Sequence, residues 1–189
     1  MEKILFVNAC IRPMSRTMVL AKHALSKLEG DVEELNLEAE RIQPHNWERL
    51  QKRDALLSSE SFDDPMFRYA RQFRDADTIV IAAPYYDLSF PASLKCWVES
   101  ICNVGLTFYY DDQNQPQTLC KGKRLIYVTT SGAEFIPDFG FGYIRRVFSE
   151  FFHIEDAVCF HAEKLDLPGK DVEACLARAA DKIDMYFAR

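Results

Sequence analysis

Short runs of consecutive apolar residues recur along this chain, and longer segments with helical periodicity separate them. Runs such as 4–7 and 79–81 are apolar at every position, which is typical of strands in a parallel sheet covered on both faces. Five segments are therefore predicted to be strands: 3–9, 32–37, 78–83, 124–130 and 157–160. Glu33 and Glu34 interrupt the second strand, which indicates a more exposed position at an edge of the sheet.

Helical patterns fill the segments between the predicted strands. Apolar residues share one helix face in the segments 21–28, 94–101, 144–151 and 172–183. A weaker pattern covers 62–73, and the polar segment 38–60 contains another at 47–57. Alternating strands and helices build a parallel sheet between two layers of helices. The sequence thus predicts an α/β fold over residues 1–189 as one domain. We expect a flavodoxin-like three-layer sandwich whose five-stranded parallel sheet has the order 2-1-3-4-5.

Composition narrows the range of partners. The chain has 189 residues, of which 48% are hydrophobic, enough for one sizeable core. Its net charge of −6 and the lack of a long basic run disfavour nucleic acid and anionic membranes. The apolar runs are much shorter than the ~20 residues of a membrane helix. The N-terminus enters the first strand without a cleavable signal pattern, so we expect a cytoplasmic protein.

Six cysteines are scattered through the sequence without a CxxC pair: Cys10, Cys96, Cys102, Cys120, Cys159 and Cys175. In a chain without a secretory signal, buried free thiols are the expected state of such residues. Zinc and iron–sulfur centres need closely spaced ligands, which this sequence lacks. We therefore expect no metal site.

The loop after the first predicted strand has the features of an anion site. In this sheet order, ligands bind beyond the carboxyl ends of strands 1 and 3. There the chain turns through Cys10 and Arg12 and enters a helix at Ser15, Arg16 and Thr17. Free N–H groups at a helix N-terminus attract anions, and the lack of P-loop and GxGxxG motifs favours a monophosphate. The alternative is that Ser15 only caps the helix and the arginines face solvent.

The connection after the third predicted strand is rich in aromatic residues. Pro84 ends the strand, and Pro91 stands where the first turn of the next helix tolerates proline. Between them, Tyr85, Tyr86 and Leu88 are expected to project over the same crevice. The alternative is that the tyrosines pack on neighbouring helices.

The fourth predicted strand ends in residues with little side-chain bulk. Thr130, Ser131 and Gly132 would let a flat ligand approach their backbone amides closely. An ordinary polar turn is the alternative. Together, a phosphate cradle, an aromatic wall and a small-residue turn at adjacent strand ends indicate a site for FMN.

Several segments occur in the order and spacing of a known family. They are Ser15-Arg16-Thr17, "APYYDLSFPASLKCWVE", "GLTFYYD" and "VTTSGA". The chain resembles the FMN-dependent NAD(P)H oxidoreductases of the flavodoxin-like fold, which include NADH-azoreductases and NAD(P)H:quinone reductases. The resemblance implies FMN held by residues 15–17, 85–88 and 130–133, the last of which ends at Ala133. It also implies a homodimer with the active site at its interface.

The resemblance implies a reaction in which the flavin carries the chemistry. NAD(P)H would reduce FMN, and a small-molecule electron acceptor (a quinone, azo or nitroaromatic compound) would then reoxidise it by a ping-pong mechanism. No catalytic side chain is required, so His153 and His161 are expected to be structural or solvent-facing. The alternative is a flavodoxin-type electron carrier that does not use nicotinamide. A phosphorylation-controlled receiver domain is excluded, because strand 3 ends without an aspartate.

Four residues depart from the pattern of this family. Cys10 stands where azoreductases commonly have serine, and Ser131 replaces an arginine seen in some members. Asp87 and Leu88 replace an asparagine and an aromatic residue. A carboxylate at position 87 that faced the flavin would lower its reduction potential by charge repulsion. The alternative is that Asp87 only caps the turn into the next helix.

Three adjacent aromatic residues stand in a polar connection. Phe108, Tyr109 and Tyr110 lie within the segment 105–117, between the third helix of the sheet and the fourth strand. Because exposed aromatic patches are costly, we expect this segment to form part of a homodimer interface.

Overall fold

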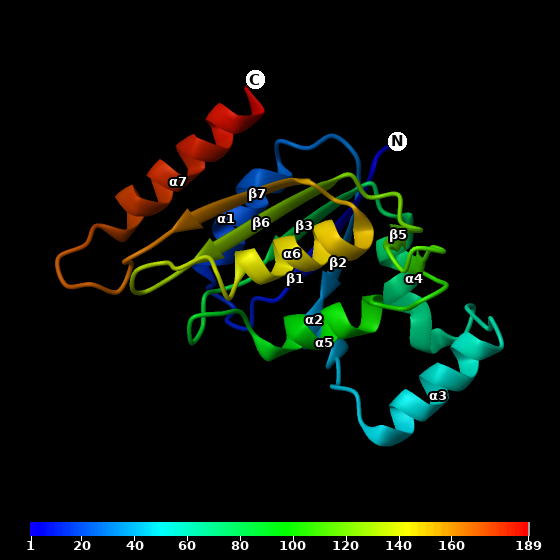
Figure 1. Ribbon diagram of the computed structural model, residues 1–189. Helices are drawn as coiled ribbons and strands as arrows, with labels where there is room; N and C mark the ends of the chain where they lie inside the picture. Colours follow the sequence, from blue (N-terminus) through cyan, green and yellow to red (C-terminus); the bar gives the residue numbers. More distant parts are fainter. Residues whose placement is uncertain (189) are drawn as a thin grey trace.

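Five parallel strands form the central sheet of the computed structural model, which describes residues 1–188 (Figure 1). They are β1 (Lys3–Asn8), β2 (Asp31–Asn36), β3 (Thr78–Ala82), β6 (Arg124–Thr130) and β7 (Asp156–Ala162). Their spatial order is β2-β1-β3-β6-β7, which confirms the predicted order 2-1-3-4-5. The acidic strand β2 lies at an edge, as its two glutamates indicate.

Helices cover both faces of this sheet (Figure 1). One layer consists of α1 (Arg16–Leu25) and α7 (Val172–Phe187), and the other of α4 (Arg68–Asp75), α5 (Ala92–Ile101) and α6 (Phe141–Phe152). Along β1, Leu5 and Val7 are buried against the α4–α6 layer, whereas Ile4 and Phe6 are buried against the α1–α7 layer. Both faces of each central strand are therefore core, which explains the unbroken apolar runs.

An aromatic cluster joins the three helices of the α4–α6 layer. The ring of Phe73 on α4 lies 5.8 Å from Trp97 on α5 and 4.6 Å from Phe152 on α6. These edge-to-face contacts add to the apolar area that the rings bury. The three helices of this layer are thus packed together on one face of the sheet.

Several elements differ from the sequence-based prediction. Strand β7 extends beyond the expected segment 157–160, because pairing with β6 continues to Thr130 and Ala162. The helix expected at 62–73 starts as a 3-10 turn at Pro65–Phe67 and continues as α4. The helix expected at 47–57 is present as α3 (Trp47–Ser58). The short helix α2 (Leu37–Glu40) was not expected.

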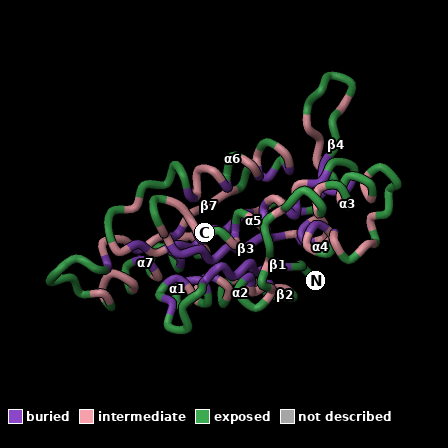
Figure 2. The backbone as a smooth tube through the Cα atoms, turned by 90° about the horizontal axis from the view of Figure 1, so that it is seen from below, coloured by how far each residue is buried: buried purple, intermediate pink, exposed green. Residues whose placement is uncertain are grey.

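The aromatic segment 105–117 belongs to a β-hairpin that the sequence pattern did not reveal. Strands β4 (Phe108–Tyr110) and β5 (Pro116–Thr118) pair antiparallel, and their loop projects from the body of the protein (Figure 2). The expectation that all three aromatic residues form a partner surface is wrong for Phe108, which is buried against Phe151 and Phe152. Tyr109 and Tyr110 remain exposed.

Candidate functional site

A cavity of about 670 Å³ lies at the carboxyl ends of β1, β3 and β6. This volume suits a nucleotide-sized ligand. The crossovers from β1 and β3 run to opposite sides here, so the cavity lies where the fold is expected to bind ligands. Ten residues predicted from the sequence line it: Arg12, Ser15, Arg16, Thr17, Pro84, Tyr85, Tyr86, Thr130, Ser131 and Gly132.

Four other predicted residues do not line this cavity, namely Cys10, Asp87, Leu88 and Ala133. Cys10 is buried, with its Sγ atom 3.8 Å from the carbonyl oxygen of Ala82, and burial raises the pKa of its thiol. The carbonyl oxygen of Ala133 accepts a hydrogen bond from the Ser131 hydroxyl at 2.7 Å. Asp87 and Leu88 are exposed beside the cavity.

The cavity also contains residues that sequence reasoning missed: Pro13, Met14, Leu165 and Asp166. Pro13 and Met14 lie between predicted residues of the first loop, so sequence continuity could have indicated them. Leu165 and Asp166 follow β7. No residue-type signal pointed to them, although the carboxyl end of a fifth parallel strand lies at the same edge of the sheet.

The N-terminus of α1 forms the most polar wall of the cavity. The Ser15 hydroxyl accepts a hydrogen bond from the Met18 N–H at 3.3 Å and so caps the helix. A hydroxyl that accepts in this way still has its own hydrogen to donate. Within residues 1–188, the backbone N–H groups of Arg16 and Thr17 have no protein acceptor. Capping and anion binding are therefore compatible at this helix end.

A hydrogen bond between two threonines connects this helix end to the sheet. Thr17 is fully buried, and its Oγ1 atom lies 2.7 Å from Oγ1 of Thr130 at the end of β6. The bond links α1 to the sheet across 113 residues of sequence. It fixes the helix N-terminus relative to the loop that begins at Ser131.

A tight turn follows Tyr85 on the opposite wall. The N–H of Tyr86 donates to the carbonyl of Ser89 at 3.1 Å, and the N–H of Ser89 donates back at 2.8 Å. The two central residues, Asp87 and Leu88, have φ values of 51° and 67°. This is a two-residue hairpin turn that usually contains Asn-Gly, and a leucine in the left-handed region costs roughly 1–2 kcal/mol. Such strain is most often retained where function requires the backbone geometry.

Tyr85 fastens the loop after β6 to this wall. Its hydroxyl donates to the carbonyl of Ile136 at 3.1 Å, and its ring lies edge-to-face at 5.2 Å from Phe135. The N–H of Phe135 donates to a carboxylate oxygen of Glu163 at 2.9 Å, and this bond lowers the pKa of that carboxyl group. Tyr85, on the loop after β3, thus lines the cavity and also packs against the loop after β6.

The two histidines considered in the sequence lie outside the cavity lining. The His161 ring stacks on Phe135 at 5.0 Å, and burial lowers its pKa. The Nε2 atom of His153 lies 2.9 Å from the carbonyl oxygen of Pro116 in the hairpin. Both contacts are made to protein atoms outside the cavity lining.

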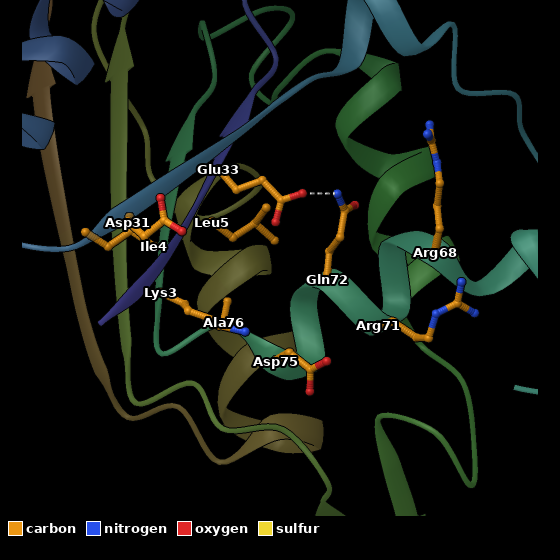
Figure 3. Close-up of a pocket in the computed structure, with 10 residues that line it drawn as sticks. All are labelled: Lys3, Ile4, Leu5, Asp31, Glu33, Arg68, Arg71, Gln72, Asp75 and Ala76. Carbon is orange, nitrogen blue, oxygen red and sulfur yellow. Dashed lines mark hydrogen bonds between the residues drawn. The ribbon is translucent and has the colours of Figure 1, made fainter. Parts of the chain in front are cut away.

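A second cavity, of about 420 Å³, lies between β2 and α4 toward the amino ends of the strands (Figure 3). Several of its side-chain donors already have protein acceptors, although the Oε1 atom of Gln72 is buried without a donor. Gln72 donates to Glu33 at 2.7 Å, and Arg71 donates to the backbone carbonyl of Asp64 at 3.0 Å. Arg68 forms an ion pair with Glu40. Ligands of this fold bind at the other end of the sheet, so the first cavity is the candidate site.

Clusters of metal-ligating side chains and membrane-spanning helices are both absent from residues 1–188. In this part of the chain, no three His, Cys, Asp or Glu side chains gather in an arrangement that could hold a metal ion. None of its helices combines the length and apolar character needed to cross a membrane.

The sheet order and the cavity at its β1–β3 divergence define a flavodoxin-like α/β protein. Comparison with protein families agrees: the Flavodoxin_2 family, described as having a flavodoxin-like fold, matches residues 2–187. The chain therefore belongs to this family.

Individual relatives are similar over nearly the whole chain. An FMN-dependent NADH:quinone oxidoreductase 2 of Clostridium acetobutylicum is 33% identical, with 96% of each chain covered. An FMN-dependent NADH:quinone oxidoreductase of Coprothermobacter proteolyticus is 32% identical over 92% of each chain. Among solved structures, an FMN-dependent NADH-azoreductase of Bacillus anthracis in complex with FMN has a TM-score of 0.84 at 21% identity. That alignment covers 100% of this chain and 99% of the other, and it supports the fold.

Proposed function

We propose that this protein is an FMN-dependent NAD(P)H oxidoreductase that reduces quinone, azo or nitroaromatic acceptors by a ping-pong mechanism. The observation that carries the proposal is the cavity in which a capped helix N-terminus, two arginines and an aromatic wall meet. The names of the relatives, both NADH:quinone oxidoreductases, support NADH as the electron donor.

The residues of the α1 end fit a phosphate monoester. Arg12 and Arg16 supply positive charge, and the N–H groups of Arg16 and Thr17 have no protein acceptor in residues 1–188. The loop enters the helix after a short turn, which leaves room for one phosphate group, so FMN is favoured over FAD. These donors and charges would hold the phosphate without any metal ion.

The other two loops fit the flat ring of a flavin. Tyr85 and Tyr86 supply apolar walls. The amide of Gly132, in the cavity lining, and the amide of Asp87, beside the cavity, have no protein acceptor within the described chain. Bound flavin supplies hydride and electron transfer. The protein positions the ring, donates these amide hydrogens to it, and excludes water with the aromatic wall. No side chain needs to act as a nucleophile.

The test is the absorption spectrum of the purified protein, followed by anaerobic addition of NADH and then NADPH. We expect a yellow protein whose flavin bands bleach rapidly with at least one nicotinamide and return when a quinone is added. Slow or absent bleaching with both nicotinamides would favour the flavodoxin-type carrier. Absence of any flavin binding would contradict both functions.

We also propose a homodimer that uses the projecting hairpin. Tyr109 and Tyr110 are exposed there, and exposed aromatic pairs are common in partner surfaces. Light scattering at micromolar concentration should give twice the mass of the 21.9 kDa chain. A particle of the monomer mass would contradict this proposal without affecting the proposed chemistry.

Two further expectations remain part of the proposal. Residues 1–189 act as one domain, which is supported by the single five-stranded sheet that both helix layers cover. The protein works in the cytoplasm, which is supported by the fact that all six cysteines are free thiols.

A further inference from the structure

A carboxylate of the cavity lining is in direct contact with the predicted phosphate cradle. The Oδ1 atom of Asp166, after β7, lies 2.7 Å from Nη1 of Arg16 on α1. Both groups remain accessible, with 69% of the Asp166 side chain and 42% of the Arg16 side chain exposed. Of the described residues that line the cavity, Asp166 is the one that carries a carboxylate. The pair therefore sits at the ligand site and is open to exchange with a ligand.

Backbone hydrogen bonds set the position of Asp166. The N–H of Leu165 donates to the carbonyl of Ser131 at 3.1 Å, and the N–H of Asp166 donates to that of Gly132 at 3.1 Å. These bonds continue the pairing of β6 and β7 into the loops beyond the strands. These bonds consequently place Asp166 beside the loop after β6, at the same edge of the sheet as the cavity.

The Asp166 carboxylate occupies the space beside Gly132. A Cβ atom at position 132 would overlap with Oδ2 of Asp166. Sequence reasoning explained the small residue by the approach of a flat ligand. The structure adds a second reason, because any side chain larger than hydrogen at this position would displace Asp166.

The contact joins two groups with opposing effects on an anion. Arg16 stands at the first helical position of α1, where its charge and the helix end both attract a phosphate. A carboxylate oxygen on the same guanidinium occupies the kind of hydrogen-bonding position that a phosphate oxygen uses. It also repels a nearby phosphate dianion.

We propose that Asp166 competes with the phosphate group of FMN for Arg16 and thereby weakens the binding of phosphorylated flavin selectively. This inference rests on the proposed FMN-dependent function. It makes Asp166 a positioning residue that acts through Arg16 and sets how strongly the cradle discriminates FMN from riboflavin. Exchange of Arg16 between the two anions requires only side-chain rotation, since both side chains are accessible.

The test compares dissociation constants of FMN and riboflavin for the apoprotein, measured by quenching of flavin fluorescence. For Asp166→Asn we expect FMN to bind about tenfold more tightly, as suits the removal of one like charge from a partly solvated site. Riboflavin, which lacks the phosphate, should change by less than about twofold. The matched control is Asp138→Asn, because Asp138 is an exposed carboxylate on the loop after β6 that does not line the cavity.

A second variant separates competition from a general charge effect. In an Arg16→Gln background, Asp166→Asn should improve FMN binding much less than in the wild type. This variant lacks the guanidinium for which the carboxylate and the phosphate compete. Unchanged or weaker FMN binding by Asp166→Asn would overturn the inference, as would an equal gain for riboflavin. A wild-type protein that binds neither flavin would instead overturn the proposed function, and the competition with it.

Discussion

Two cavities of this protein differ in how their polar groups are used. The cavity between β2 and α4 contains three cations and three carboxylates, and neighbouring protein groups accept hydrogen bonds from the side-chain nitrogens of Gln72 and Arg71. The cavity at the carboxyl ends of the strands has fewer charges. Its helix end and turns, however, present backbone N–H groups that have no acceptor in residues 1–188. The comparison shows that backbone N–H groups without an acceptor, more than charge, distinguish the candidate binding site.

The cause of this difference is the direction of the parallel strands. At their carboxyl ends, the chain leaves the sheet and enters helices, so helix N-termini with unpaired N–H groups gather at one edge. Near the amino ends, Glu33 of β2 and Gln72 of α4 meet across a gap and form a hydrogen bond (Figure 3). Changes at or beside the carboxyl-end cavity can therefore be compared with control substitutions elsewhere, where possible in the amino-end cavity.

The largest effect is expected from removing the two arginines of the cradle. Arg12→Gln combined with Arg16→Gln should weaken FMN binding about 100-fold, because two charge-assisted hydrogen bonds to phosphate are each worth about 1.5 kcal/mol or more. Riboflavin should be affected less than about threefold. Titration of flavin fluorescence measures both constants. The control is Lys3→Gln with Arg68→Gln in the amino-end cavity, and an equal loss there would remove the distinction between the cavities.

A smaller effect is expected from breaking the buried threonine pair. Thr17→Val keeps the shape of the side chain but removes its hydroxyl, and it should lower the free energy of unfolding by about 1.5 kcal/mol. Denaturant unfolding monitored by circular dichroism gives this value. Glu33→Gln, which alters the Gln72 contact in the amino-end cavity, should cost less than about 0.5 kcal/mol because the pair is exposed. Similar costs for both variants would contradict the structural role assigned to Thr17.

Relief of the strain in the turn at Asp87 and Leu88 should stabilise the protein. Leu88→Gly should raise the free energy of unfolding by about 0.5–1 kcal/mol, because glycine adopts a positive φ without steric cost. Leu167→Gly is the matched control: Leu167 is also an exposed loop leucine but lacks a positive φ. That control should be destabilised by about 0.5 kcal/mol, since glycine loses more backbone entropy on folding. Loss of stability in Leu88→Gly would show that the turn is not strained.

The smallest effect concerns Asp87. Its side chain is exposed and does not line the cavity. At about 8 Å through water, its repulsion of a reduced flavin would be about 0.5 kcal/mol. For a two-electron couple this corresponds to on the order of 10 mV. Asp87→Asn should therefore raise the FMN midpoint potential only slightly in a spectroelectrochemical titration, and Asp31→Asn in the amino-end cavity should leave it unchanged. A rise of about 60 mV or more would place the carboxylate against the flavin.

Sequence patterns predicted the central sheet but did not predict the β4–β5 hairpin. The unbroken apolar runs of β1 and β3 predicted buried parallel strands, and the glutamates of β2 predicted the edge. Strands β4 and β5 are three residues each, too short to show an alternating pattern. The burial of Phe108 depends on Phe151 and Phe152 of α6, and no local pattern encodes such a contact.

The sequence by itself determined the architecture and most of the cavity lining, because strand periodicity and loop composition are local properties. Ser15, Tyr85 and Gly132 could be assigned to one crevice once the strand order was known, since carboxyl ends of parallel strands share an edge. Only the tertiary structure decided which groups remain unpaired there. The contact of Arg16 with Asp166 spans 150 residues, and it arises from the pairing of β6 with β7 and from the packing of α1 on the sheet. Long-range contacts of this kind depend on the geometry of the whole fold. No sequence motif in the loops after β1 and β7 could therefore predict this one.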